Sequence, residues 1–342
     1  MHRAGRTLWS AQLPSTPRCL GLGQRYVRVL IRAMVTSGFS FSIESQYAYI
    51  HVHVFTIYYS YYCTGTRVTD IEGNTYYDFL SAYSAVNQGH CHPKIIAALT
   101  EQAQKLTLTS RAFHNDALGE YSEFITNYFG YDRVLPMNTG VEGGETAVKL
   151  ARRWGYEVKG IPPNKAKVLF ANHNFWGRTL AAISSSNDPT AFRGFGPYMP
   201  GFSHVPFNDL GSLEMAFEQD GEHICAFMVE PIQGEAGVVV PEDGYMRKVQ
   251  ELCAKHNVLL IADEVQTGLG RTGHELAVHH DECKPDIVVL GKVSVSLEFC
   301  GHQKIVTLSF LTFFFRLPPL IIRPSLAVSC PYRPSWPRTQ SC

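Results

Sequence analysis

Several classes of protein are excluded by what this sequence lacks. Its nine cysteines are odd in number and scattered, with no Cys-x-x-Cys pair, which argues against a disulfide framework or a zinc ribbon. Its 30 basic and 30 acidic residues cancel, and no basic run is long enough to form a patch for nucleic acid. No apolar run reaches the ~18 to 20 residues that a membrane span requires. The sequence therefore indicates a globular protein of a reducing compartment, without a nucleic-acid partner and without a membrane span.

Acidic residues are scarce at both ends of the chain. The first 43 residues contain several arginines and hydroxyl-bearing residues, and the first acidic residue is Glu44. This composition is typical of an organelle transit peptide, with a disordered basic leader as the alternative. At the other end, residues 293–342 contain a single acidic residue, several prolines and no lasting helical or alternating pattern. We do not expect this tail to continue an α/β domain.

An aromatic and β-branched stretch at residues 45–63 is strand-prone. On a strand, His51 and His53 would project from the same face, as two metal ligands would. No Cys, Asp or Glu partner stands at a matching spacing, so ordinary strand residues are the favoured interpretation and no metal site is predicted.

The region between these ends has regular periodicity. Residues 68–79 have the punctuation of a strand, a turn and a second strand, which predicts a hairpin. Helical spacing of apolar residues predicts three helices, one from Pro93, one over residues 118–128 and one after Gly140. Beyond residue 163, strands alternate with helices, and the expected strands are 168–171, 224–229, 258–262 and 287–290. This alternation predicts βαβ units and a mostly parallel sheet, and therefore an α/β fold.

Two of these strands end on residues that can do chemistry. The strand at 258–262 runs into Asp263, Glu264 and Gln266, and the strand at 287–290 is followed by Lys292. A lysine after an apolar strand is costly to bury unless its amine is used, and the commonest use is a Schiff base with a carbonyl cofactor. Pyridoxal 5'-phosphate is the obvious candidate, because its ring nitrogen needs a carboxylate partner such as Asp263.

The remaining strand ends carry groups that suit the same cofactor and its substrate. Gly140 and Val141 open a helix at a glycine-containing turn, where free N–H groups can hold a phosphate. Phe175 can stack on a planar ring, and Arg178 can bind a carboxylate through two hydrogen bonds. Glu235 can meet an amine or mask an arginine. Each has an ordinary alternative, such as a helix start, core packing or a solvated loop side chain, so their weight comes from occurring together.

Taken together, these motifs resemble the class III (fold type I) pyridoxal-phosphate-dependent aminotransferases. The resemblance runs from about Gly65 to Lys292, and the matching stretches are 79–93, 138–147, 174–179, 229–237, 261–268 and 290–292. It implies the large domain of that fold, a mostly parallel sheet flanked by helices, with the C-terminal small domain absent. The implied division is a leader at 1–43, an N-terminal segment at 44–92 with a non-homologous insert at about 50–63, a partial cofactor-binding domain at 93–292 and a non-homologous tail at 293–342.

The resemblance also implies roles for the cofactor-binding residues. Lys292 corresponds to the Schiff-base lysine, which also moves a proton between the substrate carbon and the cofactor, and Asp263 would keep the ring nitrogen protonated. Gln266 would hydrogen-bond the phenolic oxygen, and Phe175 would stack on the ring. The phosphate would be bound by Gly140 and Val141.

On the substrate side, the resemblance implies that Tyr83 and Arg178 contact the substrate and that Glu235 shapes its carboxylate site. The implied reaction transfers the δ-amino group of ornithine to 2-oxoglutarate, in a homo-oligomer of the mitochondrial matrix. Two alternatives stay open. One is a related transaminase acting on acetylornithine or 4-aminobutyrate. The other is an inactive fragment, which binds a full-length partner or is degraded, because the tail would leave the sheet with an uncovered edge.

Overall fold

The computed structural model describes residues 60–109, 112–292 and 311–315, with side chains described from residue 62 to residue 292. The first elements form a small antiparallel sheet of β1 (Ser60–Thr64), β2 (Arg67–Asp70) and β3 (Thr75–Tyr77). The turn between β2 and β3 is held by Asp70, whose Oδ1 accepts the N–H groups of Glu72 and Asn74, both at 2.9 Å. The hairpin predicted for residues 68–79 is therefore confirmed. The leader, His51 and His53 lie outside the described residues.

Among the described residues, seven strands form one large sheet in the order β4-β10-β9-β8-β7-β5-β6. Every neighbouring pair is parallel except those that involve β10, which is antiparallel to both β4 and β9. The mostly parallel sheet predicted from the sequence is confirmed. Its strands are β4 (Arg133–Met137), β5 (Lys167–Ala171), β6 (Phe202–Val205), β7 (Ile224–Val229), β8 (Leu259–Asp263), β9 (Ile287–Leu290) and β10 (Leu311–Phe315).

The helices begin where the sequence provides caps. Asn115 and Thr139 accept the N–H groups of Leu118 and Glu142 at the starts of two long helices, and Gly130 ends the first of these in the left-handed conformation. None of the described helices is long and apolar enough to cross a membrane. The helices are α3 (Ser81–Ser84), α4 (Pro93–Lys105), α5 (Asp116–Phe129), α6 (Gly140–Trp154), α7 (Leu180–Ser184), α8 (Pro189–Phe192), α9 (Leu210–Asp220) and α10 (Tyr245–Lys255), with a π-helical turn at Gly155–Lys159 and a 3₁₀ turn at Ala277–Asp281.

Alternation along the strands places a hydrophobic core on each face of the large sheet. In β5, Val168 and Phe170 belong to one core while Leu169 and Ala171 belong to the other, as the two-residue period of a strand requires. Helices α6 and α7 cover the first core, and α5, α9 and α10 cover the second. Because both faces are covered, the strands are apolar almost throughout. The sheet offers its strand ends, rather than its faces, to a ligand.

Helix α6 packs unusually close to the sheet. A Cβ atom added at Gly143 would lie 3.0 Å from Val289, and one added at Gly144 would lie 2.6 Å from the ring of Trp176. Both glycines are buried in the helix, where glycine is otherwise unfavourable. Their small size therefore brings the start of α6 against β9 and against the loop that follows β5.

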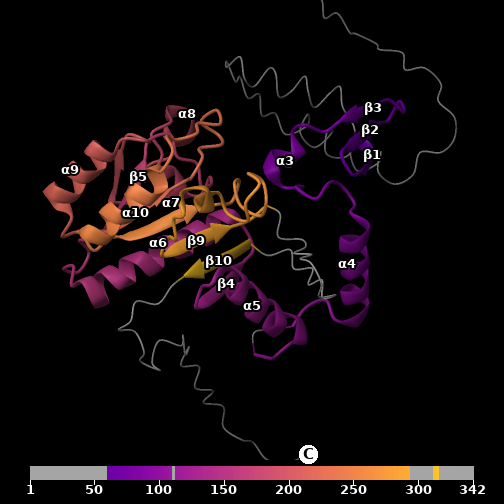
Figure 1. The fold of residues 1–342 in the computed structure, drawn as a ribbon, viewed down its shortest axis with the longest axis horizontal. Helices are drawn as coiled ribbons and strands as arrows, with labels where there is room; N and C mark the ends of the chain where they lie inside the picture. The colour runs from indigo at the N-terminus through magenta and orange to yellow at the C-terminus, as the bar shows by residue number, and fades with distance from the viewer. Residues whose placement is uncertain (1–59, 110–111, 293–310, 316–342) are drawn as a thin grey trace, which may run out of the picture. The chain divides into compact units, whose positions relative to one another are not determined.

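The position of β10 corrects one expectation. The tail after residue 293 was not expected to continue the domain, yet Leu311–Phe315 pairs with β4 on one side and β9 on the other (Figure 1). The uncovered edge expected beside β9 is therefore absent, because a short apolar segment needs only a strand-compatible backbone to fill a vacant sheet position. Elements β6 and α9 were also not predicted, because β6 is only four residues long and the apolar residues of α9 are not confined to one face.

We expect Gly144→Ala to lower the free energy of unfolding by about 1 to 3 kcal/mol, because the added methyl group overlaps the Trp176 ring. The matched control is Gly119→Ala in α5, where a Cβ atom meets nothing within 4 Å. That change should raise stability by about 0.5 to 1 kcal/mol, since alanine favours the helix. Urea denaturation of both variants tests the packing, and equal effects would contradict it.

Candidate active site

The carboxyl ends of three neighbouring strands bring acidic and basic side chains together. Glu230 follows β7, Asp263 ends β8, and Lys292 lies two residues beyond β9. Since β7, β8 and β9 are adjacent and parallel, these residues share one edge of the sheet. The pairing of Asp263 with Lys292 that the sequence suggested is consistent with this placement.

Asp263 is a buried carboxyl group whose surroundings oppose its charge. Its side chain is 5% exposed, and burial raises its pKa to about 7, with the nearby Glu264 adding to the rise. The backbone N–H of Val265, 3.0 Å from Oδ1, and the charge of Lys292 act in the opposite direction. A cation placed against Asp263 would therefore find an acidic group with few competing partners.

Lys292 is half-buried, and burial lowers the pKa of its amine. The negative charges of Glu235, Asp263 and Glu230 partly offset this effect. Its backbone has a φ of +61°, a conformation that costs a residue with a side chain roughly 1 kcal/mol or more. An amine with a lowered pKa is closer to the neutral form that acts as a base or nucleophile.

The loop after β5 is held by its own aromatic residue and by a carboxyl group. Trp176 is buried, stacks on Phe170 with ring centroids 5.8 Å apart, and donates its Nε1–H to Ser185. The N–H of Phe175 donates to Glu230 Oε1 at 3.0 Å, which fixes Phe175 at the sheet edge. Gly177 has a φ of +146° and lies so close to Val141 that an added Cβ atom would be 2.4 Å from its Cγ2.

The start of α6 is built as a capping box. Glu142 accepts the N–H groups of Asn138 and Thr139, and Thr139 accepts the N–H of Glu142. This box does not use the N–H groups of Gly140 and Val141, which lie in the first helical turn, where donors have no partner within the helix. Together with the helix dipole, they suit a phosphate.

Gln266 and Glu235 form the next part of the site. Gln266 Nε2 donates to Glu235 Oε1 at 2.9 Å. Gly234 lies against the same amide, and an added Cβ atom would come within 2.2 Å of Gln266 Oε1. The structure thus joins two residues that the sequence placed on separate loops.

The two predicted substrate residues, Tyr83 and Arg178, are exposed. Arg178 makes no hydrogen bond or ion pair among the described residues, so its guanidinium is available to a ligand. Tyr83 is 50% exposed and lies in α3, a turn with positive φ at all four residues. Arg271 ties this turn to the loop after β8 through Ser81 Oγ at 3.4 Å and through Asn87 Oδ1. No contact between Tyr83 and the other site residues is described.

Glu230 escaped the sequence-based site, and Glu264, which the sequence singled out beside Asp263, was given no role in it. Glu230 is 7% exposed with a pKa raised to about 8, mainly by burial and then by Asp263. Glu264 is fully buried and accepts the Thr267 hydroxyl and the N–H groups of Ala277 and Val278. The signal was available, since each glutamate directly follows or ends an apolar strand. Glu264 holds a neighbouring loop, whereas Glu230 faces the site.

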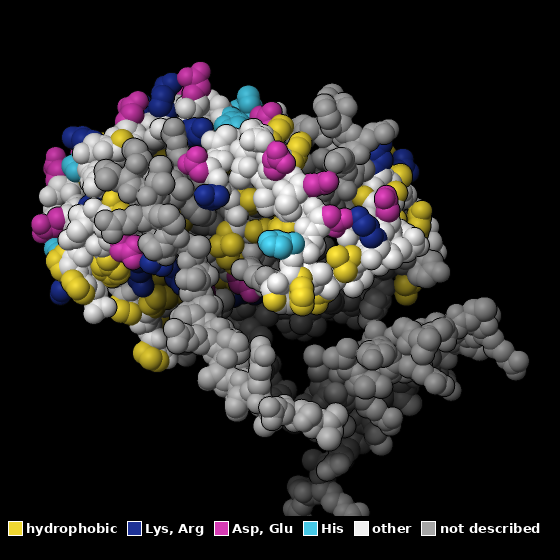
Figure 2. Space-filling model, turned by 90° about the horizontal axis from the view of Figure 1, so that it is seen from below, with side chains coloured by type: hydrophobic (Ala, Val, Ile, Leu, Met, Phe, Trp, Pro, Cys, Tyr) yellow, Lys and Arg dark blue, Asp and Glu magenta, His cyan; other side chains and the backbone are white. Residues whose placement is uncertain are grey.

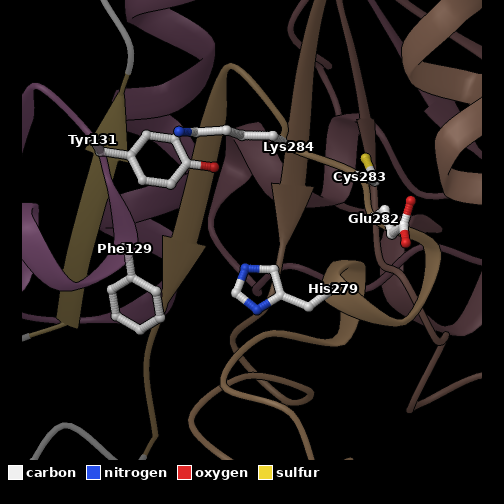
Figure 3. A pocket seen from close by; sticks show the side chains of 6 residues that line it. All are labelled: Phe129, Tyr131, His279, Glu282, Cys283 and Lys284. Atoms are coloured by element: carbon white, nitrogen blue, oxygen red, sulfur yellow. The ribbon is translucent and has the colours of Figure 1, made fainter.

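A separate groove lies away from these residues. It is lined by Phe129, Tyr131, His279, Glu282, Cys283 and Lys284, and Figure 3 shows Lys284 extending over the Tyr131 ring. Tyr131 precedes β4 and Lys284 precedes β9, so the groove lies at the amino edge of the parallel sheet, opposite the chemistry. Among the described residues no cluster of His, Cys, Asp and Glu suits a metal ion.

Comparisons with known proteins agree with this arrangement. The profile of the class-III aminotransferases matches residues 50–297. The chain is 62% identical over 245 residues to the mitochondrial ornithine aminotransferase of Drosophila melanogaster and 61% identical over 250 residues to that of Rattus norvegicus. These alignments cover 70% and 71% of this chain, and 56% of each relative. The chain therefore spans a little over half the length of these curated relatives.

Solved structures give the same result. An ornithine aminotransferase of Toxoplasma gondii, described with partial occupancy of PLP at its active site, superposes with a TM-score of 0.71 at 46% identity, covering 84% of this chain and 66% of that one. An acetylornithine aminotransferase of Elizabethkingia anophelis superposes with a TM-score of 0.65 at 48% identity, covering 80% of this chain and 66% of that one. The fold and the lysine-centred sheet edge define an aminotransferase large domain. The chain belongs to the class-III aminotransferase family.

We expect the free energy of unfolding of the cofactor-free protein to decrease as the pH rises from about 4 to about 7, and we expect Asp263 to cause part of this decrease. Because burial raises the pKa of Asp263 to about 7, the folded state keeps a proton that the unfolded chain releases near its ordinary pKa of 3.8. The Asp263→Asn variant cannot bind this proton, so its free energy of unfolding should decrease less steeply with pH, by up to about 1.4 kcal/mol per pH unit. Urea denaturation across this range tests the sign, and an unchanged slope would contradict the raised pKa.

Proposed function

We propose that this chain carries the cofactor site of a pyridoxal-phosphate-dependent transaminase that moves the δ-amino group of L-ornithine to 2-oxoglutarate, giving glutamate 5-semialdehyde and glutamate. The observation that carries the proposal is the placement of Lys292, with its lowered pKa, at the same sheet edge as the buried Asp263. The identity to ornithine aminotransferases, above 60% for the fly and rat proteins, supports the choice of substrate.

The residues present fit the cofactor. Asp263 is buried and short of partners, which suits a protonated ring nitrogen, and the first turn of α6 offers Gly140 and Val141 to the phosphate. Phe175 would lie against the ring, and Gln266 would donate to its phenolic oxygen. When bound, pyridoxal phosphate supplies a carbonyl that exchanges amino groups and a ring that takes up electrons.

The chain's own residues would perform the remaining work. Lys292 Nζ would hold the cofactor and, once released, would take the proton from the amine-bearing carbon of the substrate and pass it to the cofactor. Its lowered pKa favours this, because a base must be neutral before it accepts a proton. Asp263 would keep the ring nitrogen protonated throughout, and burial would exclude the water that weakens this ion pair.

The substrate side rests on Tyr83, Arg178 and Glu235. Arg178 would bind a substrate carboxylate, for which its free guanidinium is suited. Glu235 accepts a hydrogen bond from Gln266 through Oε1, and its other oxygen would shape the carboxylate site. A related reaction on acetylornithine is the second candidate, favoured by the likeness to the Elizabethkingia enzyme.

We extend the proposal to the organisation and location of the chain. Residues 93–292 would form the partial cofactor-binding domain, after a leader at 1–43 and an N-terminal segment at 44–92 with a foreign insert at about 50–63. Residues 293–342 would be a non-homologous tail from which β10 is recruited. Because the fly and rat relatives are named mitochondrial and the leader is acid-free, we place the protein in the mitochondrial matrix.

The cofactor claim is tested by the absorbance of the purified chain after incubation with pyridoxal phosphate. We expect a band of bound cofactor that is retained on gel filtration and lost in Lys292→Ala, because that lysine makes the covalent attachment. Lys165→Ala is the matched control, since Lys165 lies in an exposed turn before β5. No band in the wild type would refute cofactor binding, and amino-group transfer from ornithine, acetylornithine and 4-aminobutyrate would rank the substrates.

We also propose that the chain pairs with a second copy of itself or with a full-length relative. Figure 2 shows apolar side chains at several places between charges of both signs on one face. Large apolar residues before β4 are strongly exposed, including Phe79 at 95%, Leu108 at 83% and Phe113 at 71%. Apolar side chains of this size would be covered if they lay together in one interaction surface.

Leu108→Glu should weaken this association by at least about tenfold, since a charge would enter an apolar contact. Met215→Glu on α9, at an equally apolar but isolated exposed position, is the control and should leave association unchanged. Sedimentation velocity over a concentration series measures both. A wild-type chain that stays monomeric throughout and does not pair with a full-length relative would remove the proposal.

A further inference from the structure

Glu230 is a buried acid at the centre of the site, and this residue has no role in the proposed reaction. It is the first residue after β7, and β7 lies between β8 and β5 in the sheet. Its neighbours on either side therefore carry Asp263 and the loop with Phe175. Its side chain is 7% exposed, a costly location for a carboxyl group unless its oxygens are used.

Both oxygens of Glu230 are used, and by different loops. Oε1 accepts the N–H of Phe175 at 3.0 Å, from the loop after β5. Oε2 accepts the N–H of Gly234 at 3.3 Å, from the loop after β7. One carboxyl group thus bridges two loops that are 59 residues apart between Phe175 and Gly234 in the sequence.

The second of these contacts reaches Gln266. The backbone of Gly234 lies against the Gln266 amide, where an added Cβ atom would be 2.8 Å from Cδ, and the same amide donates to Glu235. Fixing Gly234 therefore fixes the surface on which Gln266 rests. A continuous set of contacts connects Phe175, on the ring side, with Gln266, on the phenolic-oxygen side.

We propose that Glu230 is a positioning residue that clamps the loops after β5 and β7, so that Phe175 and Gln266 are held at a fixed separation around the cofactor ring. The proposal rests on the proposed function for the identity of the ring, but the clamp itself exists without it. Glu230 touches neither substrate nor cofactor in this role. It acts through the two backbone N–H groups.

A neutral residue would not do the same work. Glutamine at this position offers a single oxygen acceptor, and its amide N–H₂ group would face the second backbone donor. The chain already ties the same loops with a neutral group, because Gln233 Nε2 donates to Asn172 O at 2.7 Å. A second tie that requires burying an acid beside Asp263 indicates a need for the two acceptor oxygens of a carboxyl group.

The test is hydrogen exchange of the full chain carrying Glu230→Gln, measured with and without pyridoxal phosphate. We expect the amides in residues 172–178 and 231–237 to exchange about tenfold faster, which corresponds to one lost hydrogen bond. Amides of β7 should be unchanged. Glu264→Gln is the matched control, because it removes an equally buried carboxylate that holds Ala277 and Val278 and should loosen only that loop.

Two further measurements separate positioning from plain stability. The dissociation constant for pyridoxal phosphate should rise about tenfold in Glu230→Gln. In titrations carried above about pH 8, where Glu230 is ionised, the pH at which the bound cofactor's absorbance changes should also move down, because the variant lacks that negative charge near Lys292. Glu230→Asp keeps the carboxyl group but is too short to reach both donors, so it should reproduce the exchange result if Glu230→Gln fails to fold.

Faster exchange throughout the chain, or no change in the two loops, would overturn the clamp. The proposed function fails separately, because a wild-type chain that binds no pyridoxal phosphate would still show the exchange pattern of the clamp. The clamp would be supported if residues 172–178 and 231–237 are protected in the wild type and lose this protection locally in both Glu230 variants.

Discussion

The burial of carboxyl groups at one edge of a parallel sheet is the constraint on which this site depends. Parallel strands place their carboxyl ends together, and here that brings Glu230, Asp263 and Lys292 into one low-dielectric region. Burial opposes every one of these charges, raising the pKa values of the acids and lowering that of the amine. Such a site is poised for a cationic ring, which would relieve the cost of the buried acids.

The surrounding fold can be understood as support for this edge. Gly143 and Gly144 bring α6 close enough for its first turn to face the same edge, and Gly177 lets the next loop pass against Val141. The start of α6 and the loop after β5 are therefore held together where the glycine backbone meets the side chains of Trp176 and Val141. A larger side chain at any of these glycines would push the start of α6 away from the sheet or from the loop after β5.

Much of this could be predicted from the sequence, for a physical reason. Apolar strands that end at Asp263 or just before Lys292 predict both the sheet and the reactive residues at its edge, because a charged side chain is rarely buried without a functional role. The hydrogen bond between Gln266 and Glu235 and the link from Glu230 to Phe175 could not be predicted, since they depend on how loops distant in sequence meet. The strand β10 was missed because its sheet position is set by its neighbours more than by its own pattern.

The strand order then relates the tail to the chemistry. Lys292 follows β9 with a left-handed backbone conformation. On the side away from β8, β9 pairs with β10 through residues 287–290 and 312–315. Without β10, that side of β9 would expose unpaired N–H and C=O groups and the lysine would follow an edge strand. With β10 present, β9 is an interior strand, paired on both sides. The tail need not resemble the family to contribute here, because backbone pairing places few demands on side-chain identity.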